Sequence, residues 1–222
     1  MTGANATSPA RRGPTAPSAG APGDAPGAAR PLPSGALASG ALAGALVHLR
    51  ALEPEDFEHV LELAGDLELL RAVGETRLGT SALAARRWCE ERCAASVGTP
   101  EASVSTLVVE TTEQVAVGLI EWRPTSLRQR VCSHALAIKG RYRRRGFGRE
   151  ALELLLGFAF DELGFYRAEA EIYAFNEASI ALHRSLGFIE EGRRREAAFT
   201  AGRRHDILLF GLLARDFSAR RT

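Results

Sequence analysis

Apolar and polar residues alternate in short runs along most of the chain after about residue 45. The run LVHLRAL changes character at nearly every step, which is the period of a strand that buries one face. The next run, EPEDFEHVLELAGD, instead places Phe57, Val60 and Leu61 three or four positions apart. This is the period of an amphipathic helix, and Pro54 suits its first turn. Both strands and helices are therefore expected.

The remaining runs predict the order of the other elements. A second helix is expected to begin at Thr80 or Ser81, and SVSTLVVE, QVAVGLIEW and VCSHALAI predict three strands after it. The run REALELLLGFAFDELG predicts a helix that ends at Gly164, and YRAEAEIYAF a strand. NEASIALHRSLG predicts a short helix with Asn176 as its cap and Gly187 as its end. FIEEGRRREAAFT and RHDILLFGLL predict a closing hairpin, which completes a mixed α/β sheet.

Composition separates the first 45 residues from the rest. Seven of the ten prolines lie in the first 33 residues among Ala, Gly and Ser, and large apolar side chains are nearly absent there. Such a segment cannot offset the entropy lost on ordering. We therefore predict a disordered tail at 1–45, one globular domain at 46–217 and a C-terminal tail at 218–222. The run SGALASGALAGALV is too short and Gly-rich to span a membrane, and a cleaved targeting segment is the alternative interpretation.

The charge balance argues against a strongly basic nucleic-acid-binding protein. Three of the 28 basic residues and one of the 27 acidic residues precede residue 46, which leaves 25 against 26 in the domain. No global field favours nucleic acid or a membrane surface. Cys89, Cys93 and Cys132 form no Cys-x-x-Cys pattern. We expect reduced thiols in a cytoplasmic protein, and no metal.

The segment RYRRRGFGR joins a predicted strand to a predicted helix. The N-terminus of a helix leaves backbone N–H groups unpaired and carries partial positive charge, so it binds anions. Gly146 and Gly148 allow the backbone to approach an anion closely, because no Cβ intervenes. A dinucleotide fingerprint would need glycines that this loop lacks, and a Walker loop would need Gly-Lys-Ser/Thr. The context fits a loop that holds a pyrophosphate.

The longer pattern resembles a known family. Arg143-x-x-Gly146-x-Gly148 after a strand resembles the acyl-CoA pyrophosphate loop of the GCN5-related N-acetyltransferase (GNAT) superfamily, Gln/Arg-x-x-Gly-x-Gly/Ala. Further along, NEASIALHRSLGF is similar to the second signature of that family, Asn-x-x-Ala/Ser-x-x-Leu-Tyr-x-x-x-Gly-Phe. The matching residues are Asn176, Ser179, Leu182, Gly187 and Phe188. The C-terminal part resembles the branch that acetylates ribosomal-protein N-termini and, in relatives, spermidine.

The resemblance implies a fold and a co-substrate. The GNAT fold is an α/β domain with a mixed sheet of about seven strands and four helices, and its cofactor loop lies between the fourth strand and the third helix. Acetyl-CoA would be the co-substrate. Strand backbone at Leu136 and Ile138 would bind its pantetheine arm, together with Asn176, for which a plain helix cap is the alternative role. The residues around the pyrophosphate would be Arg143, Arg144, Gly146, Phe147, Gly148 and Arg149.

Transfer of an acetyl group to an amine requires a base for the ammonium proton and an acid for the leaving thiolate. In many family members the acid is a tyrosine after the matching leucine; here that position is His183, and histidine titrates near neutrality. Glu121 and His134 are the candidates for the base. Strand alternation leaves open whether Glu121 or Ile120 faces the cleft, and His134 could instead be half-buried in the sheet. A water relay is a further alternative.

We therefore expect an acetyl-CoA-dependent N-acetyltransferase whose acceptor is a primary amine: a protein N-terminus, a polyamine, or a small amine or antibiotic. Acidic residues of the first helices would face a cationic acceptor or form a solvated surface; they are Glu62, Asp66, Glu68 and Glu75. An inactive acyl-CoA sensor is one alternative, because the tyrosine is absent. An RNA- or ribosome-binding module that uses the arginine runs is another. No nucleic acid or membrane partner is expected, and a homodimer is compatible with the resemblance.

Overall fold

A seven-stranded mixed sheet forms the centre of the computed structural model, which describes residues 42–74, 79–95 and 104–220. The strands are β1 (Val47–Ala51), β2 (Ser105–Thr111), β3 (Ala116–Ser126), β4 (Val131–Ile138), β5 (Arg167–Tyr173), β6 (Ile189–Thr200) and β7 (Arg203–Leu213). They lie in the order β1-β2-β3-β4-β5-β7-β6, and each neighbouring pair is antiparallel except β4 and β5. The predicted mixed sheet of seven strands is confirmed.

Within the described residues, six α-helices surround the sheet, where four were expected. They are α1 (Phe57–Ala64), α2 (Leu67–Ala72), α3 (Ala82–Ala95), α4 (Phe147–Gly157), α5 (Glu177–Leu186) and α6 (Ala214–Ser218). Shorter turns are Pro54–Asp56 and Gly140–Tyr142, both 3-10, and a π-helical turn at Phe158–Glu162. The expected count was wrong because two short helices, α2 and α6, were not predicted. Asp66 begins α2, which it caps by accepting a hydrogen bond from the Leu69 amide at 2.9 Å. The glycine loop consequently precedes the fourth helix.

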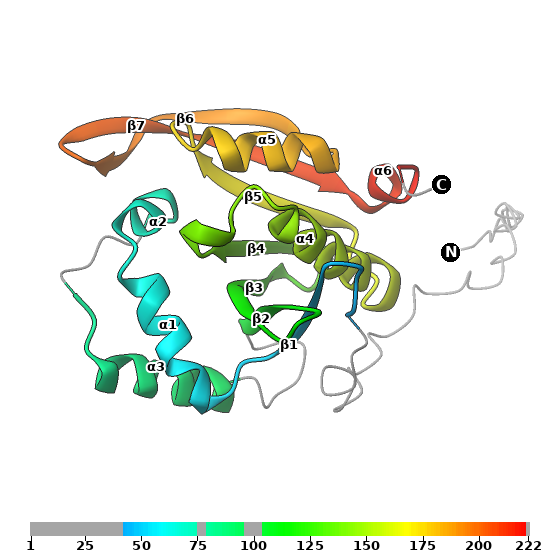
Figure 1. Cartoon of the computed structure of the whole chain (residues 1–222). Coiled ribbons are helices and arrows are strands. Elements are labelled where there is room, and N and C mark those ends of the chain that lie inside the picture. Colours follow the sequence, from blue (N-terminus) through cyan, green and yellow to red (C-terminus); the bar gives the residue numbers. More distant parts are fainter. Residues whose placement is uncertain (1–41, 75–78, 96–103, 221–222) are drawn as a thin grey trace, which may run out of the picture.

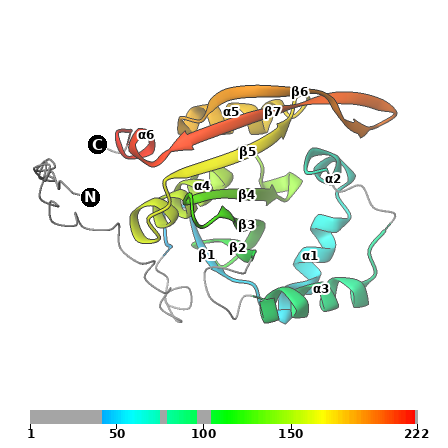
Figure 2. The ribbon, with the colours of Figure 1, turned by 180° about the vertical axis from the view of Figure 1, so that it is seen from behind.

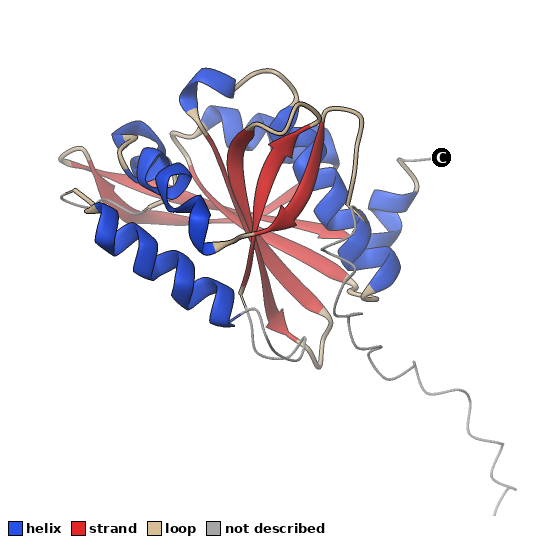
Figure 3. Cartoon of the chain, turned by 60° about the horizontal axis from the view of Figure 1, so that its bottom comes forward, coloured by secondary structure: helices blue, strands red, loops and turns tan. Residues whose placement is uncertain are grey.

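Helices cover both faces of the sheet (Figure 1 and Figure 3). Helices α4, α5 and α6 share the larger hydrophobic core with residues such as Ile120 and Phe210. Helices α1 and α3 cover the other face in a smaller core around Cys89, and the reverse view in Figure 2 shows them across the strands from α4. Neighbouring residues of β3 serve the two cores, Ile120 the larger and Leu119 the smaller. This follows from the alternation of side chains along a strand.

Strands β4 and β5 are paired only where they begin. Their parallel register joins 131–133 to 167–169. Beyond this point β4 continues beside β3 to Ile138, and β5 continues beside β7 to Tyr173. The sheet therefore opens between the two strands from His134 onward. Backbone groups on an unpaired strand edge are free to bind a ligand.

The packed chain begins before residue 46, where the domain was expected to start. Leu42 is 5% exposed in the larger core, and its carbonyl accepts a hydrogen bond from the Leu49 amide at 2.9 Å. The amides of residues 45–47 donate to the carboxylate of Glu150 at 2.7–2.9 Å, which fixes this segment to the first turn of α4. Four ranges lie outside the described residues: 1–41, 75–78, 96–103 and 221–222. The first contains most of the expected tail, and the second contains Glu75.

Candidate active site

The loop between β4 and α4 has the backbone shape that an anion site requires. Gly146 is the N-cap of α4 and has φ 88°, a left-handed conformation that glycine adopts without strain. The Glu150 amide donates to the Gly146 carbonyl at 3.1 Å, which is the first bond of this helix. The amides of Phe147, Gly148 and Arg149 therefore have no carbonyl of the same helix to bond. An anion such as a phosphate suits this position.

The loop arginines differ in what they contact. Arg143 donates from Nε to the Ile138 carbonyl at 3.0 Å and from Nη2 to the Asp66 carboxylate at 2.8 Å, so it closes the loop and attaches it to the start of α2. Arg149 donates to side chains of α4 and α5. Arg144 is exposed, with φ 62°. Arg145 is exposed as well, so the guanidinium groups of Arg144 and Arg145 are the ones open to an incoming anion, while Arg143 closes the loop.

Leu136 and Ile138 lie against the glycine loop. A Cβ atom on Gly148 would come 3.2 Å from Leu136 Cδ2 and 3.3 Å from Ile138 Cγ1. The glycine thus permits the first turn of α4 to approach β4 closely. The backbone of Leu136 and Ile138 belongs to the part of β4 that is not paired with β5, where the pantetheine arm was expected.

Asn176 caps α5. Its Oδ1 accepts a hydrogen bond from the Ser179 amide at 3.1 Å, and its Nδ2 donates to the Ala72 carbonyl at 3.4 Å. The cap predicted from the sequence is confirmed. The second bond ties α5 to the end of α2 and leaves the contact with pantetheine a prediction.

His134 and His183 meet although they are 49 positions apart in the chain. His134 directly follows the last residue of β4 that is paired with β5, and His183 lies on α5 with 5% of its surface exposed. Their Nε2 atoms are 3.0 Å apart. Phe188 packs edge-on against His183, with 4.9 Å between the ring centroids. The pair therefore lies at the opening of the sheet, in largely apolar surroundings.

Hydrogen bonding assigns the proton on each neutral ring. His183 Nδ1 is 2.7 Å from the carbonyl oxygen of Ser179, which can only accept, so Nδ1 carries a hydrogen. Neutral His183 then presents a lone pair at Nε2, to which His134 donates its Nε2 hydrogen. Burial lowers the pKa of His134 to about 3, with His183 as a second cause, and burial also lowers the pKa of His183. At neutral pH both rings are uncharged and one proton lies between the two Nε2 atoms.

Glu121 faces the side of the sheet opposite to the histidines. Trp122 is the cross-strand partner of His134, so alternation directs Glu121 to the other face. There Glu121 lines a cleft of about 790 Å³ between the helices α1–α3 and the strands β3 and β4, whereas Ile120 is fully buried in the larger core. This settles the alternative that the sequence left open. The Glu121 carboxylate accepts a hydrogen bond from Arg123 Nε at 3.1 Å.

The acidic residues in and beside α1 and α2 contact basic residues of the loop between β4 and α4 rather than the large cleft. Glu62 is 2.7 Å from the Nζ atom of Lys139, and Asp66 binds Arg143. Both line a separate cavity of about 240 Å³. Glu68 lies 3.6 Å from Arg143, and its side chain is 87% exposed. None of these three carboxylates lines the 790 Å³ cleft, so they are not placed to meet a cationic acceptor there.

Comparison with known proteins decides the family. The family model described as "Acetyltransferase (GNAT) domain" matches residues 47–189, a range that contains the glycine loop, the opening between β4 and β5, and both histidines. The chain belongs to the GNAT acetyltransferase family. The resemblance drawn from the two sequence signatures is thereby confirmed, and the protein is an acyltransferase.

Individual relatives agree with this assignment. The chain is 32% identical to the SPbeta prophage-derived uncharacterized N-acetyltransferase YokL of Bacillus subtilis (strain 168) over 169 residues. The aligned part is 76% of this chain and 90% of that protein. Over 100 residues it is 26% identical to the spermidine N(1)-acetyltransferase of Vibrio cholerae, covering 45% and 58% of the two chains. The structure of the Vibrio cholerae spermidine N-acetyltransferase in complex with CoA and spermine aligns with a TM-score of 0.70 and 20% identity, over 79% of this chain and 99% of that one. This last likeness shows the fold.

Two residues that line the 790 Å³ cleft were not predicted from the sequence. Arg123 and Arg92 flank Glu121, with Arg92 Nη2 3.7 Å from the Glu121 carboxylate. The signal for Arg123 was present, because residues two apart on a strand share a face. No local pattern could reveal Arg92, which reaches the cleft from α3.

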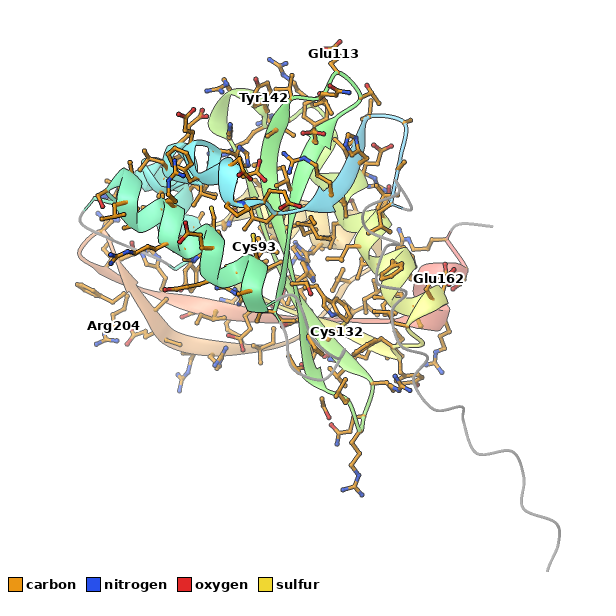
Figure 4. All side chains as sticks on the ribbon, turned by 90° about the horizontal axis from the view of Figure 1, so that it is seen from below. Cys93, Glu113, Cys132, Tyr142, Glu162 and Arg204 are labelled. Atoms are coloured by element: carbon orange, nitrogen blue, oxygen red, sulfur yellow. The ribbon has the colours of Figure 1, made fainter. Side chains whose placement is uncertain are left out.

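The three cysteines are free thiols; Cys89 and Cys93 lie on α3, and Cys132 lies on β4 two residues before His134. Figure 4 shows Cys93 on α3 and Cys132 on β4. Burial raises the pKa of Cys89 to about 11 and that of Cys132 to about 12, which makes both weak nucleophiles. Among the described helices, none combines the length and apolar character required to cross a membrane.

Proposed function

We propose that the protein transfers the acetyl group of acetyl-CoA to a primary amine. The observation that carries the proposal is the opening between β4 and β5, which leads directly into a glycine loop at the N-terminus of α4. An unpaired strand edge can bond the amides of a pantetheine arm, and a helix N-terminus can hold a pyrophosphate. The complex of CoA with the Vibrio cholerae relative supports the same assignment.

The residues present fit acetyl-CoA. The amides of Phe147, Gly148 and Arg149 would hold the pyrophosphate, with the guanidinium of Arg144 beside it. The left-handed backbone of Gly146, with φ 88°, explains the glycine at the start of this site. The backbone of β4 from Leu136 to Ile138 would hold the pantetheine arm.

Acetyl-CoA supplies a thioester carbonyl for attack by an unprotonated amine. The protein must therefore remove a proton from the acceptor ammonium and deliver one to the thiolate. In the neutral pair, His183 has no hydrogen on Nε2, so it cannot by itself be the acid that the sequence suggested. The neutral pair cannot release its shared proton without leaving an imidazolate. We therefore assign the pair the role of a relay, which would first accept the proton removed from the acceptor ammonium and then deliver that proton to the thiolate at the opening of the sheet.

Glu121 is assigned to the acceptor side. It lines the cleft on the face opposite to His134, and its carboxylate lies between two arginines. There it would bind the ammonium group of the acceptor before deprotonation. The base that removes the ammonium proton would be Glu121 itself or, in a water relay, a water molecule beside Glu121.

Two measurements test the proposal. Calorimetric titrations with acetyl-CoA, NAD and ATP should show binding of acetyl-CoA alone, and thiol release in the presence of an amine panel should show turnover. Acetyl-CoA binding without turnover of any amine would favour the acyl-CoA sensor. Binding of NAD in place of acetyl-CoA would contradict the assignment of the loop, and RNA binding that weakens steeply with salt would favour the RNA-binding module.

A further inference from the structure

The large cleft has mostly apolar walls. Its volume of about 790 Å³ is within the range of small-molecule sites. Leu63 and Leu70 line it from α1 and α2, Trp88 from α3, and Leu119 and Leu136 from the sheet. An acceptor that fills this space would bury an apolar body, because polar groups without partners are costly to bury.

The charged residues of the cleft are mixed in sign. Among the described residues, those that line it are Arg87, Arg92, Arg123, Glu91 and Glu121. Arg123 donates to the Glu121 carboxylate, which is also 3.7 Å from Arg92. The side chain of Arg123 is 42% exposed and that of Glu121 is 14% exposed. A cation and an anion therefore lie side by side, and the cation is the more accessible of the two.

A polyamine would meet little complementary charge in this cleft. It carries only positive groups and needs several carboxylates, but three arginines line the described part of the cleft and Glu121 is already bonded to one of them. The carboxylates of Glu62 and Asp66 are bound to basic residues of the cofactor loop. Like charges placed together would oppose binding of a polycation.

We infer that the acceptor is a zwitterionic amine with an apolar side group, of the kind that an apolar α-amino acid presents, and not a polyamine. Its ammonium group would bind Glu121, its carboxylate would bind Arg123, and its apolar group would pack against Trp88 and Leu119. Arginine is suited to a carboxylate by its planar fork of N–H groups. The inference rests on the proposed function and narrows it to one acceptor class.

Paired acceptors test the role of the carboxylate. Thiol release should be measured with leucine and leucinamide, with phenylalanine and phenylalaninamide, and with spermidine. Each amino acid should give a kcat/KM at least about tenfold above that of its amide, since a charge-assisted hydrogen bond is typically of that size. Equal values for acid and amide, or a preference for spermidine, would overturn the inference. An amide preference would point instead to a peptide N-terminus.

Variants identify the arginine. Arg123→Gln should lower kcat/KM for leucine about tenfold or more, change leucinamide little, and improve spermidine, because Glu121 loses its partner. Arg128→Gln is the matched control, since Arg128 lies in the turn after β3 and does not line the cleft. Loss of both leucine and leucinamide in Arg123→Gln would contradict a specific role for the carboxylate.

Binding measurements separate this inference from the proposed function. Calorimetry of leucine, leucinamide and spermidine, each in the presence of CoA, requires no turnover. Tighter binding of leucine than of the other two would support the acceptor class even if no amine released CoA, in which case only the proposed transfer would fail. Tighter binding of spermidine or leucinamide, or no binding of leucine, would refute the acceptor class.

Discussion

Replacing Gly146 by aspartate should weaken CoA binding strongly while the fold survives. Gly146 has φ 88°, and an added Cβ would lie 3.2 Å from Leu46 Cδ1, the end of a side chain that can move. The left-handed conformation costs a residue with a Cβ about 1–2 kcal/mol. In a domain of this size each kcal/mol lowers Tm by about 2–4 °C, so the variant should still melt cooperatively.

The binding loss is larger than the loss of stability. A carboxylate about 5 Å from a phosphate charge repels it by about 3 kcal/mol at an effective dielectric constant near 20. This corresponds to a dissociation constant about 100-fold weaker, and the deficit should shrink as salt screens the repulsion.

Gly202→Asp is the matched control. Gly202 has φ 74° in the turn between β6 and β7, and no heavy atom lies within 4 Å of an added Cβ. It imposes the same backbone strain and the same charge far from the cofactor loop. Calorimetric titration with CoA and a thermal melt should be run on both variants and on the original chain. CoA affinity in Gly146→Asp within about threefold of the original value would refute the assignment of this loop to the pyrophosphate.

Three further predictions concern the N-terminal segment and the histidines. Removing residues 1–41 should leave Tm and CoA affinity unchanged, whereas Leu42→Ala should lower the free energy of unfolding by about 2–5 kcal/mol because Leu42 is buried. The same Tm in the truncated protein and in Leu42→Ala would contradict the packing of Leu42. His183→Ala should lower kcat about 10²–10⁴-fold with CoA affinity nearly unchanged, and a change below about threefold would place the proton donor elsewhere. Stability should fall as pH decreases from 6.5 to 5, because the unfolded chain protonates His134 and His183 near pH 6.5 while their folded pKa is lowered, that of His134 to about 3. The free energy of unfolding should change by at most about 1.4 kcal/mol per pH unit for each histidine. Urea unfolding at several pH values measures this dependence, and the same dependence in His134→Leu would show that His134 is not its cause.

Local patterns determined most elements but not all of their ends: a single helix was expected up to Gly164, whereas α4 ends at Gly157 and a π-helical turn follows at Phe158–Glu162. Strand alternation predicted all seven strands, and Asn176 and Gly187 marked the ends of α5 correctly, because a cap bonds amides only three or four residues away. The two signatures identified the family and the position of the glycine loop. Helix α2, which begins after Asp66, was missed because a six-residue segment is too short to show a helical period.

The sequence by itself thus determined the strands, the caps, the loop and the family, all of which depend on neighbours along the chain. Only the tertiary structure decided that His134 meets His183, that Glu121 faces the cleft beside Arg123 and Arg92, and that Leu42 belongs to the core. Contacts between residues tens of positions apart depend on strand order and register, and a shift of one residue in register would direct Glu121 to the opposite face. The chemistry of the site therefore follows from the packing of the sheet, which no local pattern specifies.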